Sequence, residues 1–419
     1  MINWCLGLDL CDDYSQLSYY NRKTSGAEAV SAGQDERFCL VPTILCKQKG
    51  GDAWFIGQEA YRLALLGEGI IVDRLVSLAV QSGTVTMEER KYTAAELLEC
   101  YIGKLLELIL KDEDSRIMQL VFTVQKLESV LMDLLVKVGD HLNIPRDAIH
   151  IVSHTEAYLF YVLGRSTSAP QHTGCLFDLT ESGFHYYEMR VVRGRTPQII
   201  EGIHEELEEG FSLDILEQES GMKLADSIVS ACAQRQMGKK VIHSVYLTGK
   251  GFEQTDWAVD SLKWLCQGRR VYAGQNLFAQ GAAFIAWDHT RPQTDYPYIC
   301  LCEGRISSTI TMEVLHQGKS CQLVVAAAGS NWYEAKADAE LIVDQEDQIH
   351  FQVQTIGEEG IRTWTLSLDM FPERPPKTTR LELIFAFVEE KSMMVRVIDK
   401  GFGELFPSSG QEIKQFFSL

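Results

Sequence analysis

The amino-acid sequence predicts an α/β body followed by an all-β domain, and three observations carry this prediction. Strand-like and helix-like segments alternate through the first 290 residues, which is typical of α/β proteins. After Tyr298 the chain alternates strands and turns without a convincing helix, which favours an antiparallel sandwich. A strand-turn-strand segment near the N-terminus is also repeated after residue 173. With 419 residues, the chain is long enough for two or three domains.

The composition is that of an ordinary globular protein, with 46% hydrophobic and 23% charged residues. The net charge of −19 makes nucleic acid and anionic membrane surfaces poor partners for the molecule as a whole. The N-terminus lacks the basic region of a signal peptide, and no apolar stretch approaches the roughly 20 residues that span a bilayer. Eleven cysteines without a CxxC pair favour reduced, buried thiols over a metal or redox role. We therefore expect a cytoplasmic protein.

The predicted elements of the first half are three strands and three helices. The strands span residues 2–10, 38–46 and 118–124, where apolar residues dominate. The helix over 92–110 has capping-box spacing between Thr93 and Glu96 and an apolar repeat at helical period. Two further helices are predicted over 128–144 and 154–164, the first closed by Asn143 and Pro145 and the second by Gly164.

The second half repeats the alternation of strands and helices. A strand pair over 174–190 precedes an apolar segment over 196–203, a mostly helical stretch over 210–236 and a strand over 240–251. Helices over 255–268 and 276–289 complete the body, and residues 290–297 form the predicted boundary. Strand-like segments then follow to about Asp399, and residues 410–419 are interpreted as a short helix or a frayed tail.

The repeated segment reads "WCLGLDLCDDYSQLSYY" over 4–20 and "GCLFDLTESGFHYYEMR" over 174–190. Asp9 and Asp178 stand at matching places, each near the end of the first strand of its copy. Two such hairpins can face each other across a cleft and hold the phosphates of a nucleotide between their turns. In that arrangement turn amides surround the phosphate oxygens, and the two carboxylates hold Mg²⁺ through water.

Further motifs extend this pattern to a resemblance with the DnaK-type heat-shock chaperones of the actin-like ATPase superfamily. "GLDLCDDYS" and "CLFDLTESGFHYYEMRV" are similar to the first and second phosphate loops of that family. "VIHSVYLTGKG" with "QGAAFIAW" resembles its adenosine motif. "LDMFPERPPKTTRLELIFAFVEEKSMMVRVIDKGFGE" is similar to a segment of its peptide-binding β-domain. The motifs follow one another in the family's order and cover nearly the whole chain.

The resemblance implies an actin-like ATPase fold with duplicated ribonuclease-H-like halves, followed by an all-β sandwich. The implied halves are residues 1–172 and 173–292, and the implied peptide-binding β-domain is 298–407. ATP or ADP with Mg²⁺ is the implied cofactor, with Asp9 and Asp178 as metal ligands. The residues implied to face the nucleotide are Asp9, Cys11, Asp12, Asp13, Asp178, Thr180, Gly183, Gly249, Lys250, Gly251 and Gly281.

The chain departs from the family where the nucleotide would bind. Cys11-Asp12-Asp13 replaces Gly-Thr-Thr in the first loop, and Thr180-Glu181-Ser182-Gly183 replaces most of the glycines of the second. Side chains at these positions block the close approach of a phosphate. One added negative charge about 6 Å from another costs roughly 2.8 kcal/mol at an effective dielectric constant near 20. Lys250 takes the place of a glycine in the adenosine turn, and the chain stops at Leu419 before the family's helical lid.

Several polar residues keep a simpler interpretation. Asp9 and Asp178 can each cap a strand-turn junction instead of holding a metal. The acidic side chains of both turns can be solvated instead of binding a cation. His154, His185 and His204 share no metal-ligand spacing, so we interpret each as an exposed histidine or one with a protein partner.

The favoured function is that of a chaperone-like protein with a weak or inactive ATPase body. Such a protein binds a polypeptide client or a partner protein through its β-domain. Two alternatives stay open, namely an active ATPase with rewired phosphate loops and a scaffold in a larger assembly. No nucleophile–base pairing indicates another enzyme class, so the chain is at most a weak ATPase and no catalytic residue is assigned.

Overall fold

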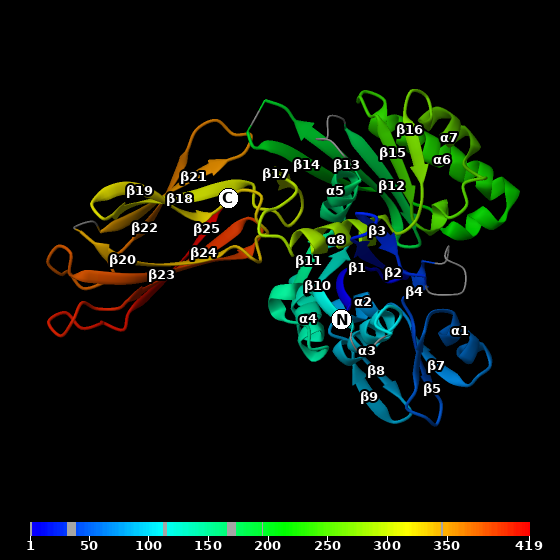
Figure 1. Cartoon of the computed structure of the whole chain (residues 1–419), viewed down its shortest axis with the longest axis horizontal. Coiled ribbons are helices and arrows are strands. Elements are labelled where there is room, and N and C mark those ends of the chain that lie inside the picture. Colours follow the sequence, from blue (N-terminus) through cyan, green and yellow to red (C-terminus); the bar gives the residue numbers. More distant parts are fainter. Residues whose placement is uncertain (1, 32–38, 112–114, 166–172, 195, 345–346) are drawn as a thin grey trace. The chain divides into compact units, whose positions relative to one another are not determined.

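The computed structural model describes residues 2–31, 39–111, 115–165, 173–194, 196–344 and 347–419, and it is a mixed α/β structure (Figure 1). The chain forms two compact units, Met1–Tyr298 and Ile299–Leu419, and β17 (Tyr298–Leu301) begins at the boundary. Among the described residues, none of the helices combines the length and the apolar character needed to cross a membrane.

The first sheet of the larger unit contains the N-terminal hairpin. Its strands are β1 (Ile2–Leu10), β2 (Tyr14–Asn21), β3 (Gly26–Ala29), β10 (Ser115–Val124) and β11 (Ile149–Ser153), in the order β11-β10-β1-β2-β3. β1, β2 and β3 are antiparallel, whereas β1, β10 and β11 are parallel. The short β4 (Val41–Pro42) pairs with β2.

The second sheet has the same strand order and the same directions. It contains β12 (Gly174–Thr180), β13 (Gly183–Val192), β14 (Gln198–Leu207), β15 (Ser244–Thr248) and β16 (Arg270–Ala273), ordered β16-β15-β12-β13-β14. β12, β13 and β14 are antiparallel, and β12, β15 and β16 are parallel. The repeated sequence segment therefore belongs to a repeat of five strands.

Equivalent residues occupy equivalent places in the two sheets. Asp9 pairs with Thr123 on its parallel neighbour, and Asp178 pairs with Thr248 on the corresponding strand. Both aspartates lie near the carboxyl end of the central strand. Because the carboxyl ends of parallel strands meet at one edge of a sheet, the helix that follows β11 begins at this same edge.

Helices cover the two sheets of the larger unit. They are α3 (Ala94–Leu106), α4 (Ser129–His141), α5 (His154–Gly164), α6 (Glu219–Met237), α7 (Val259–Leu265) and α8 (Leu277–Asp288), with 3₁₀ turns η1 (Arg146–Ala148), η2 (Leu213–Glu217) and η3 (Lys250–Phe252). The predicted capping box of α3 is confirmed, because Thr93 and Glu96 each bond the backbone N–H of the other. α5 and α8 are almost wholly buried and pack against each other.

Between β4 and α3 the chain forms a small side structure. It contains β5 (Leu45–Gln48), β6 (Trp54–Ile56), α1 (Gly57–Leu65), β7 (Gly69–Val72), α2 (Leu75–Val80), β8 (Thr84–Met87) and β9 (Arg90–Thr93). β5, β6 and β7 form a three-stranded sheet, and β8 pairs with β9. The first turn of α2 donates hydrogen bonds to Asp12, in the turn between β1 and β2.

The smaller unit consists of two four-stranded antiparallel sheets. The sheets have the orders β19-β18-β21-β22 and β20-β23-β24-β25, and their inner faces share one apolar core. The strands are β18 (Ser308–His316), β19 (Lys319–Ala326), β20 (Lys336–Val343), β21 (Gln348–Thr355), β22 (Arg362–Ser367), β23 (Thr379–Glu389), β24 (Ser392–Asp399) and β25 (Glu412–Ser418).

The interpretation of residues 410–419 as a helix or a tail is wrong, because β25 pairs with β24 along its length. Alternation explains the strand. The side chain of Phe417 is 7% exposed within the core, whereas that of its neighbour Phe416 is 59% exposed.

Candidate functional site

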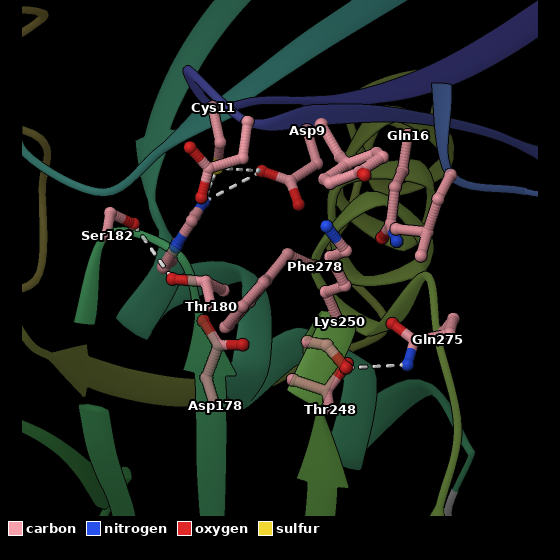
Figure 2. A pocket seen from close by; sticks show the side chains of 15 residues that line it. Asp9, Cys11, Gln16, Asp178, Thr180, Ser182, Thr248, Lys250, Gln275 and Phe278 are labelled. Carbon is pink, nitrogen blue, oxygen red and sulfur yellow. Dashed lines mark hydrogen bonds and ion pairs between the residues drawn. The ribbon is translucent and has the colours of Figure 1, made fainter. Parts of the chain in front are cut away.

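A small cavity lies where the turn of the β1–β2 hairpin faces the turn of the β12–β13 hairpin (Figure 2). Its volume is about 40 Å³. In Figure 2, Asp9 and Cys11 descend from one hairpin and Asp178 and Thr180 rise from the other. The predicted site residues that line the cavity are Asp9, Cys11, Asp13, Asp178, Thr180, Gly249 and Lys250. Asp12, Gly183, Gly251 and Gly281 lie outside its lining.

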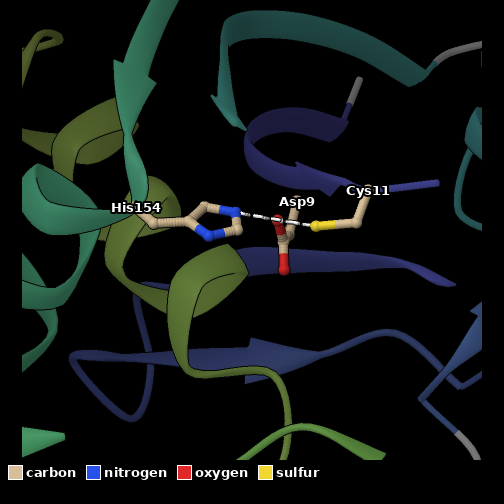
Figure 3. A group of neighbouring side chains, drawn as sticks. All are labelled: Asp9, Cys11 and His154. Atoms are coloured by element: carbon tan, nitrogen blue, oxygen red, sulfur yellow. Dashed lines mark hydrogen bonds and ion pairs between the residues drawn. The ribbon is translucent and has the colours of Figure 1, made fainter. Parts of the chain in front are cut away.

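Asp9, Cys11 and His154 form a compact cluster at the wall of this cavity (Figure 3). The Nε2 atom of His154 lies 2.8 Å from Oδ1 of Asp9. The thiol of Cys11 donates to the same oxygen at 3.6 Å, and its sulfur is 3.7 Å from Nε2 of His154. One carboxylate, one imidazole and one thiol therefore place their polar atoms within 3.7 Å of one another.

His154 was not predicted as a site residue. It was interpreted as an exposed histidine or as one with a protein partner, and the second interpretation agrees with its contact to Asp9. It is the first residue of α5, whose N-cap Ser153 accepts a hydrogen bond from the amide of Glu156. The imidazole stacks on Phe278 of α8, with 4.0 Å between ring centroids, and the residue is 2% exposed. The available signal was its place immediately after β11, because that strand ends at the same sheet edge as β1.

Asp178 faces the cluster from the second sheet. The residue is 4% exposed, and within the described parts of the chain its carboxylate has no hydrogen-bond donor. Burial raises the pKa of Asp178 to about 7, the charge of His154 opposes this rise, and the charges of Asp9 and Asp13 add to it. A buried carboxylate without a donor is unusual in proteins, where burial of a polar group normally comes with a partner.

The pKa values of two further groups at the cavity, Cys11 and Asp13, are also raised. Burial, followed by the charges of Asp9 and Asp178, raises the pKa of the Cys11 thiol well above its usual range. Burial, followed by the charges of Glu181 and Asp12, also raises the pKa of Asp13. The Oδ2 atom of Asp13 is buried and has no hydrogen-bond partner among the described residues. The cavity therefore concentrates negative charge that its own surroundings neutralise incompletely.

Lys250 joins the two hairpins across the cavity. Its Nζ lies 2.8 Å from a carboxylate oxygen of Glu181, in the turn that precedes β13, and 5.2 Å from the ring centroid of Tyr14 in β2. Burial acts to lower the pKa of Lys250, but hydrogen bonds to Glu181 and Tyr14 outweigh it and raise that pKa above its ordinary value. The ammonium group is thus already engaged by protein partners.

Asp12 does not face the cavity, although it lies between two residues that do. Its Oδ1 atom accepts hydrogen bonds of 2.9 Å from the amides of Val76 and Ser77, in the first turn of α2. The hydroxyl of Ser77 donates to the other oxygen. Asp12 thus satisfies the free N–H groups at the start of a helix, which is an ordinary structural use of aspartate.

The glycines of the predicted nucleotide site have packing roles. A Cβ on Gly281 would lie 1.9 Å from the carbonyl oxygen of Ala157, so this glycine allows α8 to approach α5. Gly249 has a φ of +88°, and a Cβ there would lie 2.4 Å from Oδ1 of Asp178. A Cβ on Gly251 would contact the side chain of Leu179 at 2.4 Å. Gly183 has a φ of +151° at the β12–β13 turn.

This arrangement does not fit a magnesium–nucleotide complex. Pockets for such ligands have volumes of about 300–1,000 Å³, whereas the cavity measures about 40 Å³. Asp13 would face the phosphates with like charge, and Lys250 is paired with Glu181. The oxygen that would hold hydrated Mg²⁺ on Asp9 is bonded to His154 beside a thiol, which is not a donor that Mg²⁺ prefers.

Comparisons with known proteins give two matches, which meet near the boundary between the compact units. Residues 26–303 match the model of the C-terminal part of a family of unknown function (DUF5716). Residues 305–419 match the model of a domain of unknown function (DUF8552). The chain has no match among curated proteins.

Proposed function

The chain belongs to the family of unknown function DUF5716, and we propose that it is a chaperone-like protein with a degenerate, weak or inactive ATPase body. In this proposal the β unit, Ile299–Leu419, binds an extended polypeptide segment of a client or partner protein. The observation that carries the proposal is the lining of the cavity, where Asp9, Asp13 and Asp178 lie between the two hairpin turns. Lys250, which also lines the cavity, is already paired with Glu181.

The organisation of the larger unit supports an actin-like body. Its two sheets share one strand order, and Asp9 and Asp178 occupy equivalent positions in them. The same positions that make the resemblance also carry the changes that disfavour a triphosphate. A body that keeps this architecture without a phosphate site can act as a rigid platform.

Exposed apolar side chains on strands at the sheet edges support polypeptide binding by the β unit. Val324 of β19 is 53% exposed, Ile342 of β20 is 54% exposed, and Phe416 of β25 is 59% exposed. All three strands end a sheet. An extended peptide can add to such a strand through main-chain hydrogen bonds, and its side chains can contact the exposed apolar residues.

Among these strands, β19 is the best candidate for the binding edge. Residues 319–322 are exposed in succession, and Val324 follows after one half-buried residue. The strand begins after a turn in which Gln317 and Gly318 have positive φ, so the β18–β19 hairpin has a defined tip. A peptide added here would run beside Cys321, which is also exposed.

Fluorescence anisotropy of a labelled, extended apolar peptide tests the proposal on the full chain. We expect the peptide to bind in the micromolar range, with or without ATP. Val324→Lys should weaken binding about tenfold or more, because a charge at an edge strand disfavours pairing. Val241→Lys is the matched control, because Val241 is 78% exposed in the other unit and should leave the affinity unchanged.

Two results would contradict the proposal. The first is the failure of apolar extended peptides to bind the full chain at any accessible concentration. The second is peptide binding that requires ATP or that Val324→Lys leaves intact, because either places the binding function elsewhere.

A further inference from the structure

We propose that Asp9, Cys11 and His154, with Asp178 on the facing hairpin, form a binding site for one divalent transition-metal ion of the zinc class. The inference goes beyond the proposed function, since peptide binding by the β unit requires no metal. It rests on the distances between the three converging donor atoms and on the burial of the Asp178 carboxylate without a hydrogen-bond donor among the described residues.

The distances between the donor atoms agree with those of a tetrahedral site. Bonds of about 2.3 Å to sulfur and about 2.0–2.2 Å to nitrogen and oxygen, at tetrahedral angles, separate the ligand atoms by about 3.4–3.6 Å. The sulfur of Cys11 lies 3.6 Å from Oδ1 of Asp9 and 3.7 Å from Nε2 of His154. Only the 2.8 Å contact between Asp9 and His154 is too short. It would lengthen by about 0.6 Å as the ion replaces the hydrogen bond.

Asp178 supplies an independent indication of a ligand. Its carboxylate lines the same cavity, and the residue is only 4% exposed. No described residue donates a hydrogen bond to this carboxylate. Asp9 is 5% exposed on the opposite wall. Two carboxylates buried around one small cavity repel each other, and a divalent cation between them would remove that repulsion.

The donor set selects the class of metal. A thiolate and an imidazole are ligands that zinc and its neighbours in the transition series prefer, whereas Mg²⁺ and Ca²⁺ prefer oxygen ligands. The cavity volume of about 40 Å³ suits an ion with one bound water. Three protein ligands with an open fourth position are also the pattern of zinc sites that keep a water, and Asp178 is placed to contact the water or the ion.

Coordination has a defined proton balance. The thiol of Cys11 releases its proton to solvent as its sulfur bonds the metal, because the thiolate is the ligand form. His154 bonds through Nε2, so the proton that Nε2 shares with Asp9 in the metal-free protein is displaced. From a neutral imidazole this proton moves through solvent to Nδ1, and from an imidazolium it leaves to solvent while Nδ1 keeps its own. Nδ1 is buried and has no hydrogen-bond partner among the described residues. No oxidation or reduction takes part.

Titration of the metal-free full chain with Co²⁺ tests the site, because Co²⁺ takes zinc sites and absorbs strongly when a thiolate is a ligand. We expect one equivalent to bind with a thiolate-to-cobalt band, and one equivalent of Zn²⁺ to displace it. Cys11→Ser should abolish the band. Loss of a direct ligand in Cys11→Ser or His154→Gln should weaken binding about 100-fold or more, since even outer contacts contribute 10–100-fold.

Matched variants separate this site from adventitious binding. Cys266→Ser and Cys321→Ser remove exposed cysteines and should leave the band and the affinity unchanged. Asp178→Asn is nearly isosteric, and we expect it to weaken Co²⁺ binding about tenfold while the thiolate band remains. Circular dichroism establishes that each variant is folded, and Asp178→Asn alone suffices if Cys11→Ser does not fold.

Three results would overturn the inference. One is the absence of stoichiometric Co²⁺ uptake by the full chain. Another is a thiolate band that survives in folded Cys11→Ser, or that disappears when only the exposed cysteines are replaced. The third is an affinity that folded Asp178→Asn leaves unchanged. Failure of the peptide assay would affect none of these results, so the two proposals are separable.

Discussion

The imidazole Nε2 atom of His154 lies 2.8 Å from Oδ1 of Asp9, across a sequence separation of 145 residues. The two side chains are 3% and 7% exposed, so water screens their interaction weakly. This contact connects the start of α5 with the end of β1 beneath the two hairpin turns. The contact engages the Asp9 oxygen that a nucleotide-bound cation would otherwise approach.

A double-mutant cycle measures the strength of this contact. With a chelator present, we expect Asp9→Asn and His154→Gln to show a coupling free energy of about 1.5–3 kcal/mol, as for buried hydrogen bonds to charged groups. Urea unfolding of the four proteins gives the value. The matched control is Glu99 with His141, a 2.7 Å pair whose side chains are 35% and 64% exposed, for which the coupling should stay below about 1 kcal/mol. Equal coupling in the two pairs would contradict the structural account.

Gly281→Ala tests the contact between α8 and α5. The added Cβ would lie 1.9 Å from the carbonyl oxygen of Ala157, so the helices must separate. We expect the free energy of unfolding to fall by about 3 kcal/mol, at the upper end of overpacking costs. Urea unfolding at neutral pH provides the measurement. Gly274→Ala is the control, since nothing lies within 4 Å of its added Cβ, and no significant loss of stability there is the expected result.

His185 should make stability depend on pH. Burial, followed by the positive charges of His204, His154 and Lys126, lowers the pKa of His185 from 6.5 to about 3 in the folded protein. At a pH between these two pKa values, the unfolded chain binds a proton at His185 that the folded chain does not. The protonation of His185 therefore does not reduce the free energy of unfolding above about pH 6.5. Below that pH the free energy of unfolding falls by about 1.4 kcal/mol for each pH unit.

Urea unfolding at pH values from about 8 to about 5 measures this slope. In folded His185→Gln, which keeps a polar group beside Gln125, the dependence should be shallower by one proton. His316→Gln removes an exposed histidine of the β unit and should leave the slope unchanged. Parallel curves for wild type and His185→Gln would mean that His185 does not titrate in this way.

Local patterns in the sequence predicted many elements correctly. The capping box at Thr93 and Glu96 located the start of α3, because a reciprocal cap is encoded within four residues. The succession of strand-like segments and turns after Tyr298 indicated the strands of the β unit, including β23 and β24. Residues 410–419 were interpreted as a helix or a tail, but Phe417 faces the core and Phe416 faces solvent, as in a strand, and both belong to β25.

The repeated segment and the family resemblance together predicted part of the site, because Gly249 and Lys250 of the adenosine motif also line the cavity. Asp9 and Asp178 were identified from matching positions, and the structure places both at one cavity. His154 carries no such signal, because its partners Asp9 and Cys11 are separated from it by 145 and 143 residues and depend on the order of parallel strands. Asp12 was predicted to face the nucleotide, but it lies outside the cavity lining. Its partners in α2 lie 64 and 65 residues away, so the local sequence does not reveal them.

Calorimetric titration of the full chain with ATP and ADP, with and without Mg²⁺, tests whether the two hairpins still bind a nucleotide. We expect no heat of binding at high protein concentration, because Asp9, Asp13 and Asp178 line the cavity between the hairpin turns and Lys250 is paired with Glu181. Micromolar binding of Mg²⁺–ATP that Asp178→Asn abolishes in a folded protein would contradict this expectation. The two hairpins would then form a working nucleotide site, and hydrolysis would become the activity to measure.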